Sequence, residues 1–166
     1  MLRMFRFLKT VPGLEKIKLE GMSAEVGIRE TFRVNGEYLI TKRDYIEGRR
    51  WDDSVCNAFY PIDLHNQNTG VHPAPLAQGV VATVPLRALI PKDSTNLLVA
   101  GRCISSDRMA NSALRVQATC MATGQAAGAA AALAAKHGVT PGKVSIAELK
   151  ALLVAHGAIV PAAVQK

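Results

Sequence analysis

Residues 96–138 read NLLVAGRCISSDRMANSALRVQATCMATGQAAGAAAALAAKHG, and most expectations for this chain start from them. Residues 97–100 are a short apolar run that ends at Gly101, a pattern typical of a strand covered on both faces. Open α/β sheets bind their ligands outside the ends of such strands. We therefore expect a ligand site beside Gly101.

A long helix of small residues is expected after this strand and a polar loop. Its span is about residues 114–135, with Ser112 as a candidate cap and Gly138 as the residue that ends it. Gly124 and Gly128 lie one turn apart on one face, where another backbone or a flat ligand can approach closely. The first N–H groups of such a helix lack partners and carry the positive end of its dipole, so an anionic group is favoured there.

Two parts of this stretch resemble a known family. NLLVAGRCISS and ALRVQATCMATGQAAGAAAALA are similar to the C-terminal signature of FAD-dependent oxidoreductases, in the flavoprotein clan that includes fumarate reductases and glycine oxidase. GIRETFRVNGEYLITKRD, NAFYPIDLHN and VPLRALIP, further upstream, resemble the same family, so the likeness covers most of the chain from Val11 onward. The resemblance implies an oxidoreductase in which FAD carries the hydride chemistry.

The resemblance also assigns residues to the cofactor. Those expected to bind FAD are Gly101, Arg102, Ser105, Arg115, Val116 and Gln117. By analogy with the family, the first two lie along the ribityl chain and pyrophosphate, and the last three face flavin N1 and O2.

The dinucleotide-binding fingerprint G-x-G-x-x-G is missing from the sequence. We therefore expect the chain to be the C-terminal portion of a longer FAD-dependent oxidoreductase, with the missing N-terminal FAD-domain sequence as its partner in the cofactor site. The 166 residues alone are expected to be inactive, to bind FAD weakly or not at all, and to cover their small-residue helix by forming a homo-oligomer. The alternative is a stand-alone protein-interaction module that packs through this Ala/Gly-rich helix.

The fold class expected is α/β, or α+β if the chain is a fragment. Residues 1–94 would form a β-rich, substrate-side region with a mostly antiparallel sheet from about residue 15 to residue 85. Residues 95–138 would supply the closing strand, loop and helix of an FAD-binding domain, and residues 139–166 a C-terminal helix and tail.

A β-hairpin is the clearest local prediction in the substrate-side region, with strands 31–34 and 37–41 joined by the turn Asn35-Gly36. Its geometry would place on one face the side chains of Arg29, Arg33 and Tyr38. Two arginines beside a tyrosine are a candidate site for an anionic small-molecule substrate. The alternative is a solvated outer face of the sheet.

Asp63 and His65 are the candidate catalytic residues, because a carboxylate beside an imidazole is the arrangement that a general base needs. The alternative is that His65 is a hydrogen-bonded structural residue of its loop. Elsewhere, Thr41 with Asp44 and Ser145 with Glu148 predict capping boxes of two short helices.

The composition argues against several other functions. The net charge of +7 is scattered along the sequence, which indicates a solvated surface rather than a nucleic-acid patch. Residues 116–135 are uncharged, but Ala, Gly, Thr and Gln give them too little transfer energy for a membrane span. The cysteines, at positions 56, 103 and 120, lack C-x-x-C and metal-site spacing, which favours reduced thiols in a cytoplasmic protein, with Cys103 as a buried structural thiol.

Overall fold

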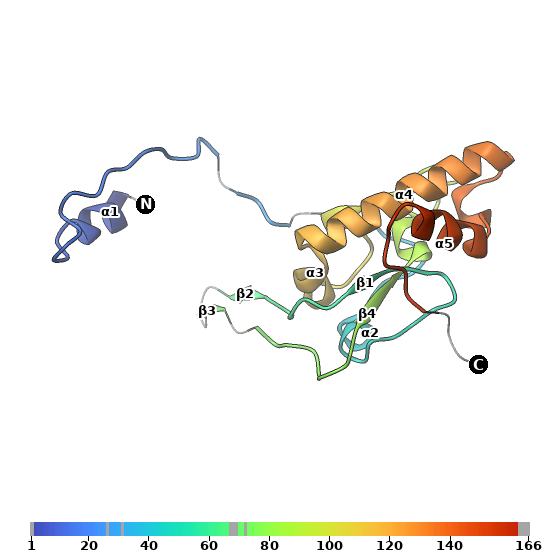
Figure 1. Ribbon diagram of the computed structural model, residues 1–166, viewed down its shortest axis with the longest axis horizontal. Helices are drawn as coiled ribbons and strands as arrows, with labels where there is room; N and C mark the ends of the chain where they lie inside the picture. Colours follow the sequence, from blue (N-terminus) through green and yellow to red (C-terminus); the bar gives the residue numbers. More distant parts are fainter. Residues whose placement is uncertain (1, 26, 31, 67–69, 72, 163–166) are drawn as a thin grey trace.

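The computed structural model describes residues 2–25, 27–30, 32–66, 70–71 and 73–162, with residues 65, 66, 70 and 71 described by their backbone alone. In chain order the elements are α1 (Leu2–Leu8), α2 (Lys42–Ile46), β1 (Ser54–Ala58), β2 (His65–Asn66), β3 (Gly70–Val71), β4 (Ala82–Pro85), the short 3-10 helices η1 (Leu86–Leu89) and η2 (Gly101–Cys103), α3 (Arg108–Leu114), α4 (Gln117–His137), the 3-10 helix η3 (Pro141–Lys143), and α5 (Ile146–Ala155). Figure 1 shows α4 as the long axis of the main body, with α5 beside it and α1 well apart from both.

The hydrophobic core lies between the β1–β4 pair and α4. The two strands are antiparallel, with Cys56 opposite Val84 and Ala58 opposite Ala82, and every residue of β4 is buried. From α4, mainly alanines and Leu133 enter this core. The small side chains of this buried face let the helix pack closely against the strands, whereas the close approach was predicted for the face of Gly124 and Gly128, which is exposed.

The expected helix of residues 114–135 is divided into α3 and α4 at Arg115 and Val116. The Ser112 cap is wrong, because Asp107 caps α3 by accepting a hydrogen bond from the Ala110 N–H at 2.7 Å. Ser112 lies inside that helix, where its hydroxyl donates to the Met109 carbonyl. The chain then turns through the extended Val116 before α4 begins. Gly138 ends α4 as predicted, in the left-handed conformation with φ 63°.

Residues 97–100 do not form the predicted strand in the part of the chain that is described. They are extended, and the Val99 N–H donates to the Leu89 carbonyl at 2.8 Å, but no ladder forms and Leu97 is 51% exposed. The mixed α/β class is confirmed. The wide antiparallel sheet is wrong, since within the described residues β1 pairs with β4 alone and β2 with β3 alone.

The predicted hairpin is also wrong. Its first expected residue, Thr31, lies outside the described residues, and the rest of the segment pairs with distant parts of the chain instead of with itself. Gly36 bridges Pro91 and Ile40 bridges Ser106. A Cβ at Gly36 would lie only 2.6 Å from the Ser105 Cβ. The Asn-Gly signal therefore marks a close approach of two backbones, not a tight turn.

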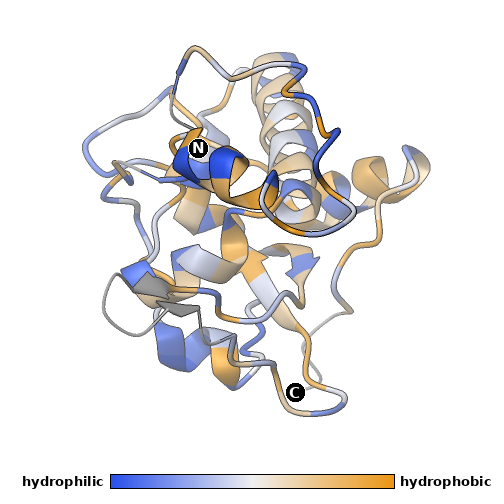
Figure 2. Cartoon of the chain, turned by 90° about the vertical axis from the view of Figure 1, so that its left-hand side faces the viewer, coloured by the Kyte–Doolittle hydropathy of each residue, from blue (hydrophilic) through white to orange (hydrophobic). Residues whose placement is uncertain are grey.

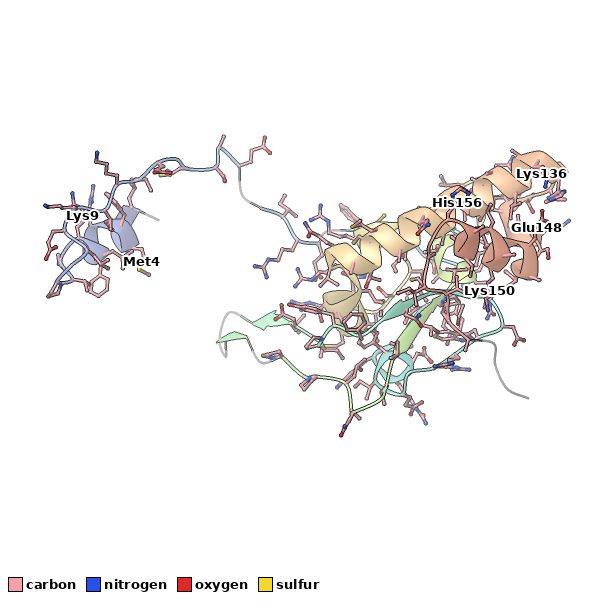
Figure 3. The ribbon with its side chains drawn as sticks, viewed as in Figure 1. Met4, Lys9, Lys136, Glu148, Lys150 and His156 are labelled. Carbon is pink, nitrogen blue, oxygen red and sulfur yellow. The ribbon has the colours of Figure 1, made fainter. Side chains whose placement is uncertain are left out.

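The helices α2 and α5 begin at the residues that the sequence predicts as their caps. Thr41 and Asp44 form the predicted reciprocal capping box of α2. At the start of α5 the structure gives half of the predicted box, in which the Ser145 hydroxyl accepts from the Glu148 N–H. At this same end of α5, the Glu148 carboxylate contacts Lys136 at 3.4 Å and His137 at 2.9 Å, in the last turn of α4. Figure 3 shows Lys136 and Glu148 close together where the two helices meet.

The α1 helix has no buried residue. In Figure 2 it lies in front of the main body and is coloured by both hydrophilic and hydrophobic residues. Among the described helices, none combines the length and the apolar character that a bilayer span requires.

Candidate active site

A cleft of about 670 Å³ opens where α3 ends and α4 begins. Its walls include six residues that the sequence had singled out: Arg29, Asp63, Arg102, Arg115, Val116 and Gln117. A neighbouring cleft of about 480 Å³ shares Arg29 and Arg102 with it and extends to Glu30 and Cys103. The structure thus brings together most of the predicted cofactor residues with one predicted catalytic and one predicted substrate residue.

The first turn of α4 is open to the cleft. Val116, at the N-cap position, makes no side-chain hydrogen bond to that turn, and Gln117 begins the helix. The helix is 21 residues long and has no acidic residue in its first turn. Its N-terminal end is therefore electropositive, and its first N–H groups are not satisfied by a side-chain cap.

Arg115 lies next to this helix start and is largely buried, with 10% of its side chain exposed. Its Nη2 donates to the Asp63 carbonyl at 3.2 Å, and its Nε lies 3.6 Å from Oε2 of Glu30. Neither Nε nor Oε2 makes a hydrogen bond within the described part of the chain. A buried guanidinium without its full set of acceptors is costly, so it is suited to complete its bonding with a ligand.

Glu30 is a site residue that the sequence reasoning missed. It contacts Arg108 at 3.9 Å as well as Arg115, so it reaches both ends of α3. The available signal was its place directly after Arg29 in a segment that resembles the family. Its arginine partners lie far along the chain, and no local pattern identifies such pairs.

Arg102 lines both clefts, and Gly101, which lines neither, precedes it at the start of η2. Gly101 has φ +76°, a conformation that favours glycine, and its N–H donates to the Thr123 hydroxyl at 3.0 Å. This bond fixes the turn on α4. The Arg102 guanidinium donates to the carbonyls of Ile28 at 2.6 Å and Arg29 at 3.4 Å. The residue therefore holds the segment of residues 28–30 against the cleft.

Ser105 and Arg33 lie outside the lining of both clefts. Ser105 is fully buried, and its backbone pairs with Ile40 and Ala88. Arg33 donates from Nε to the Ser106 carbonyl at 3.0 Å. Both residues take part in the pairing that replaces the predicted hairpin, so the structure gives them a structural place.

Tyr38 lies in a separate polar-aromatic cluster. Its ring is 5.1 Å from the Trp51 ring, and its hydroxyl donates to the Asp44 carboxylate at 3.0 Å. Burial, followed by the hydrogen bond to Asp44, raises the pKa of Tyr38. Asp44 also pairs with Arg49, while Arg87, over the Tyr38 ring, pairs with Asp53. The charges of this cluster are balanced internally, and the structure places Arg29, Arg33 and Tyr38 apart instead of on one face.

Asp63 lies in the cleft lining, and its backbone N–H donates to the Ser112 hydroxyl at 3.2 Å. His65 is the first residue of β2, but its side chain falls outside the described residues. A general-base pair of Asp63 and His65 therefore stays a prediction.

Comparison with known proteins identifies the family of the chain. The model of the family described as FAD dependent oxidoreductase matches residues 2–153. The chain belongs to this family. No match was found among curated proteins or among solved structures. The match to the FAD dependent oxidoreductase family includes every cleft residue described above. The question is then whether these residues suit FAD as a ligand.

The cleft suits part of such a cofactor. The uncapped start of α4 offers N–H donors to an electron-rich edge, and the Arg115 guanidinium beside it adds positive charge to the cleft. Arg102, which follows Gly101, adds a second guanidinium to the cleft lining. The residues present therefore fit one end of an FAD molecule.

Proposed function

We propose that this chain supplies the pyrimidine side of the flavin site in an FAD-dependent oxidoreductase. The observation that carries the proposal is that Arg115 and the uncapped N-terminus of α4 line the same cleft. Bound FAD would supply the hydride-accepting ring.

Arg115, Val116 and Gln117 are the residues we assign to flavin N1 and O2. Negative charge develops on that edge of the ring when the flavin is reduced, and a guanidinium and a helix N-terminus both stabilise it.

Gly101 and Arg102 are assigned to the ribityl chain and the pyrophosphate. The rigid attachment of Gly101 to Thr123 supports this, since a cofactor contact needs a backbone that is already in position. The small-molecule substrate is placed on the side of Arg29 and Asp63, which line the cleft next to Arg115.

Sequence beyond these 166 residues is proposed to supply the G-x-G-x-x-G turn for the pyrophosphate and the acidic residue for the adenosine ribose. Each missing charge-assisted contact is worth about 1.5 to 3 kcal/mol, and each tenfold in affinity about 1.4 kcal/mol. We therefore expect the chain alone to bind FAD only at millimolar concentrations or above, and to be inactive.

The test is the visible spectrum of the protein expressed from the full gene. We expect bound flavin in the wild type, and a loss of at least tenfold in flavin affinity for Arg115→Ala. Arg43→Ala is the matched control, because the Arg43 side chain is 84% exposed and pairs with Glu47, away from the cleft lining, and so should leave flavin content unchanged. A folded wild-type protein that takes up no FAD would overturn the proposal.

The interaction-module alternative has its own supporting observation. Gly124 and Gly128 are exposed, and nothing lies within 4 Å of a Cβ built on either residue. The close approach predicted for this face is thus not made within the described chain. Light scattering of the wild type and of Gly128→Leu would separate the two functions, because a dimer that depends on this face dissociates and a flavin site at the helix start is unaffected.

A further inference from the structure

Two of the three cysteines lie around one peptide unit at the edge of the cleft. The Cys103 thiol donates to the Ala100 carbonyl at 3.4 Å. The Cys120 Sγ lies 3.8 Å from the position that a Cβ on Gly101 would occupy. Ala100 and Gly101 are joined by one peptide bond. The Cys103 sulfur, from η2, and the Cys120 sulfur, from α4, therefore both approach this peptide unit.

Only weak bonds hold the two thiols in place. Besides the bond from Cys103, the Cys120 thiol donates to the Arg115 carbonyl at 3.4 Å. Thiols are poor hydrogen-bond donors, so either side chain can change rotamer at little cost. The backbones are held more firmly, because the Gly101 N–H is bonded to Thr123 on the same helix as Cys120.

Both thiols are free and half-buried, whereas Cys56 is buried within β1. The prediction that Cys103 is a buried thiol is therefore wrong, since it lines the 480 Å³ cleft beside Arg102. Burial raises the pKa of Cys120, and the charge of Cys103 raises it further, against the opposing effect of Arg102. Burial alone raises the pKa of Cys56 to about 12, which makes that thiol an internal control.

We propose that Cys103 and Cys120 form a redox-active pair that a hydroperoxide converts into a disulfide. The Cys103 thiolate, at the open cleft, attacks the O–O bond of hydrogen peroxide and becomes a sulfenic acid, with release of one water. The Cys120 sulfur then attacks the sulfenic sulfur, forming the S–S bond and releasing the second water. Two electrons pass from the sulfurs to the peroxide, and the two thiol protons leave in the water.

This disulfide would tie the Gly101–Cys103 turn to α4 at the cleft. The inference does not depend on bound FAD, because the sulfurs and their surroundings all belong to the chain. A failure of flavin binding and a failure of disulfide formation are therefore separate results.

The experiment is peptide mapping of the full chain after treatment with hydrogen peroxide and alkylation of the remaining thiols. Cleavage after Arg102, Arg108, Arg115 and Lys136 places Cys103 and Cys120 in different tryptic peptides. We expect these two peptides to be joined by a reducible cross-link, with Cys56 recovered in its alkylated form. The yield should not depend on protein concentration, because the bond forms within one molecule.

Cys56→Ser is the matched control and should give the same cross-link as the wild type. Cys120→Ser should instead accumulate oxidised Cys103 at least severalfold faster than the wild type, since no second thiol removes the sulfenic acid. Cross-links between molecules, links that include Cys56, or equal oxidation of Cys103 with and without Cys120 would each overturn the proposal. The wild-type map decides the question even if a variant fails to fold.

Discussion

At the last turn of α4, Gly138 donates its N–H to the carbonyls of Ala134 and Ala135, and Lys136 and His137 pair with Glu148 of α5. At the first turn, Val116 provides no side-chain cap, and Arg115 keeps one N–H without an acceptor. The chain thus satisfies one end of its longest helix by itself and leaves the other end incomplete. A helix end with a purely structural role is expected to be capped like the end at Gly138. A helix end that binds a ligand is expected to be left open like the end at Val116.

Breaking the pair that supports the open end should have the largest effect. Glu30→Ala removes the carboxylate 3.6 Å from the buried Arg115 guanidinium, and we expect the free energy of unfolding to fall by about 3 kcal/mol. Urea denaturation measures it. Glu47→Ala, in the exposed pair with Arg43, is the control and should change stability by about 0.5 kcal/mol or less. Equal losses in both variants would show that Arg115 is not a buried charge in solution.

Breaking the closed end should cost less. Gly138→Ala places a side chain at φ 63°, and we expect a loss of about 1 kcal/mol by thermal unfolding. Gly128→Ala, in the exposed middle of the same helix, should stabilise the protein by roughly 0.5 to 1 kcal/mol because it improves helix propensity without a clash. If Gly128→Ala lowers stability, a neighbour must cover that face in solution.

Capping the open end artificially sharpens the comparison. Val116→Ser offers a hydroxyl to the first-turn N–H groups, and we expect a gain of roughly 0.5 kcal/mol in unfolding free energy. The same variant should bind flavin more weakly in the full-length protein, because the new cap competes with the cofactor for the same donors. A gain in stability with unchanged flavin affinity would show that FAD does not use these N–H groups.

The smallest expected effect is the pH dependence of the closed end. The hydrogen bond from His137, more than that from Lys136, lowers the pKa of Glu148 below its ordinary value of 4.5. The pair therefore stabilises the folded chain fully at pH values above the unfolded pKa of Glu148. This stabilisation is lost as the pH falls through the lower pKa of the folded state. Glu148→Gln should lower the thermal midpoint slightly at neutral pH and not at all in strong acid. A decrease that persists in acid would point to packing instead.

The sequence was informative where a structure depends on neighbours along the chain. The caps at Thr41 and Ser145 and the end of α4 at Gly138 were predicted because each is decided within a few residues. The break at Arg115 was missed because Asp107 and Ser112 are both good caps, and only the fold selects the first. Position 36 was misread because a glycine required for close backbone contact looks the same in sequence as one required for a turn.

The cleft was predicted in outline for a different reason. Arg102, Arg115, Val116 and Gln117 were assigned by resemblance, and the structure gathers them at one cleft. Glu30, which neutralises Arg115, was not found, since an ion pair between distant segments leaves no periodic signal. The same limit applies to Arg33 and Tyr38, whose predicted common face depended on a hairpin that does not form.

The segment that replaces this hairpin also sets the order in which the protein can fold. Val34 bonds to Cys103 and Ile40 bridges Ser106, so the backbones of these two residues, in the first quarter of the chain, pair with segments in its last half. On a ribosome, the backbone N–H groups of Val34 and Ile40 must wait until residues 103–105 have been synthesised and have left the exit tunnel. Contacts of such long sequence separation slow folding, because the loop between them must close before any bond forms. The residues that hold the cleft together are thus among the last that the growing chain can assemble.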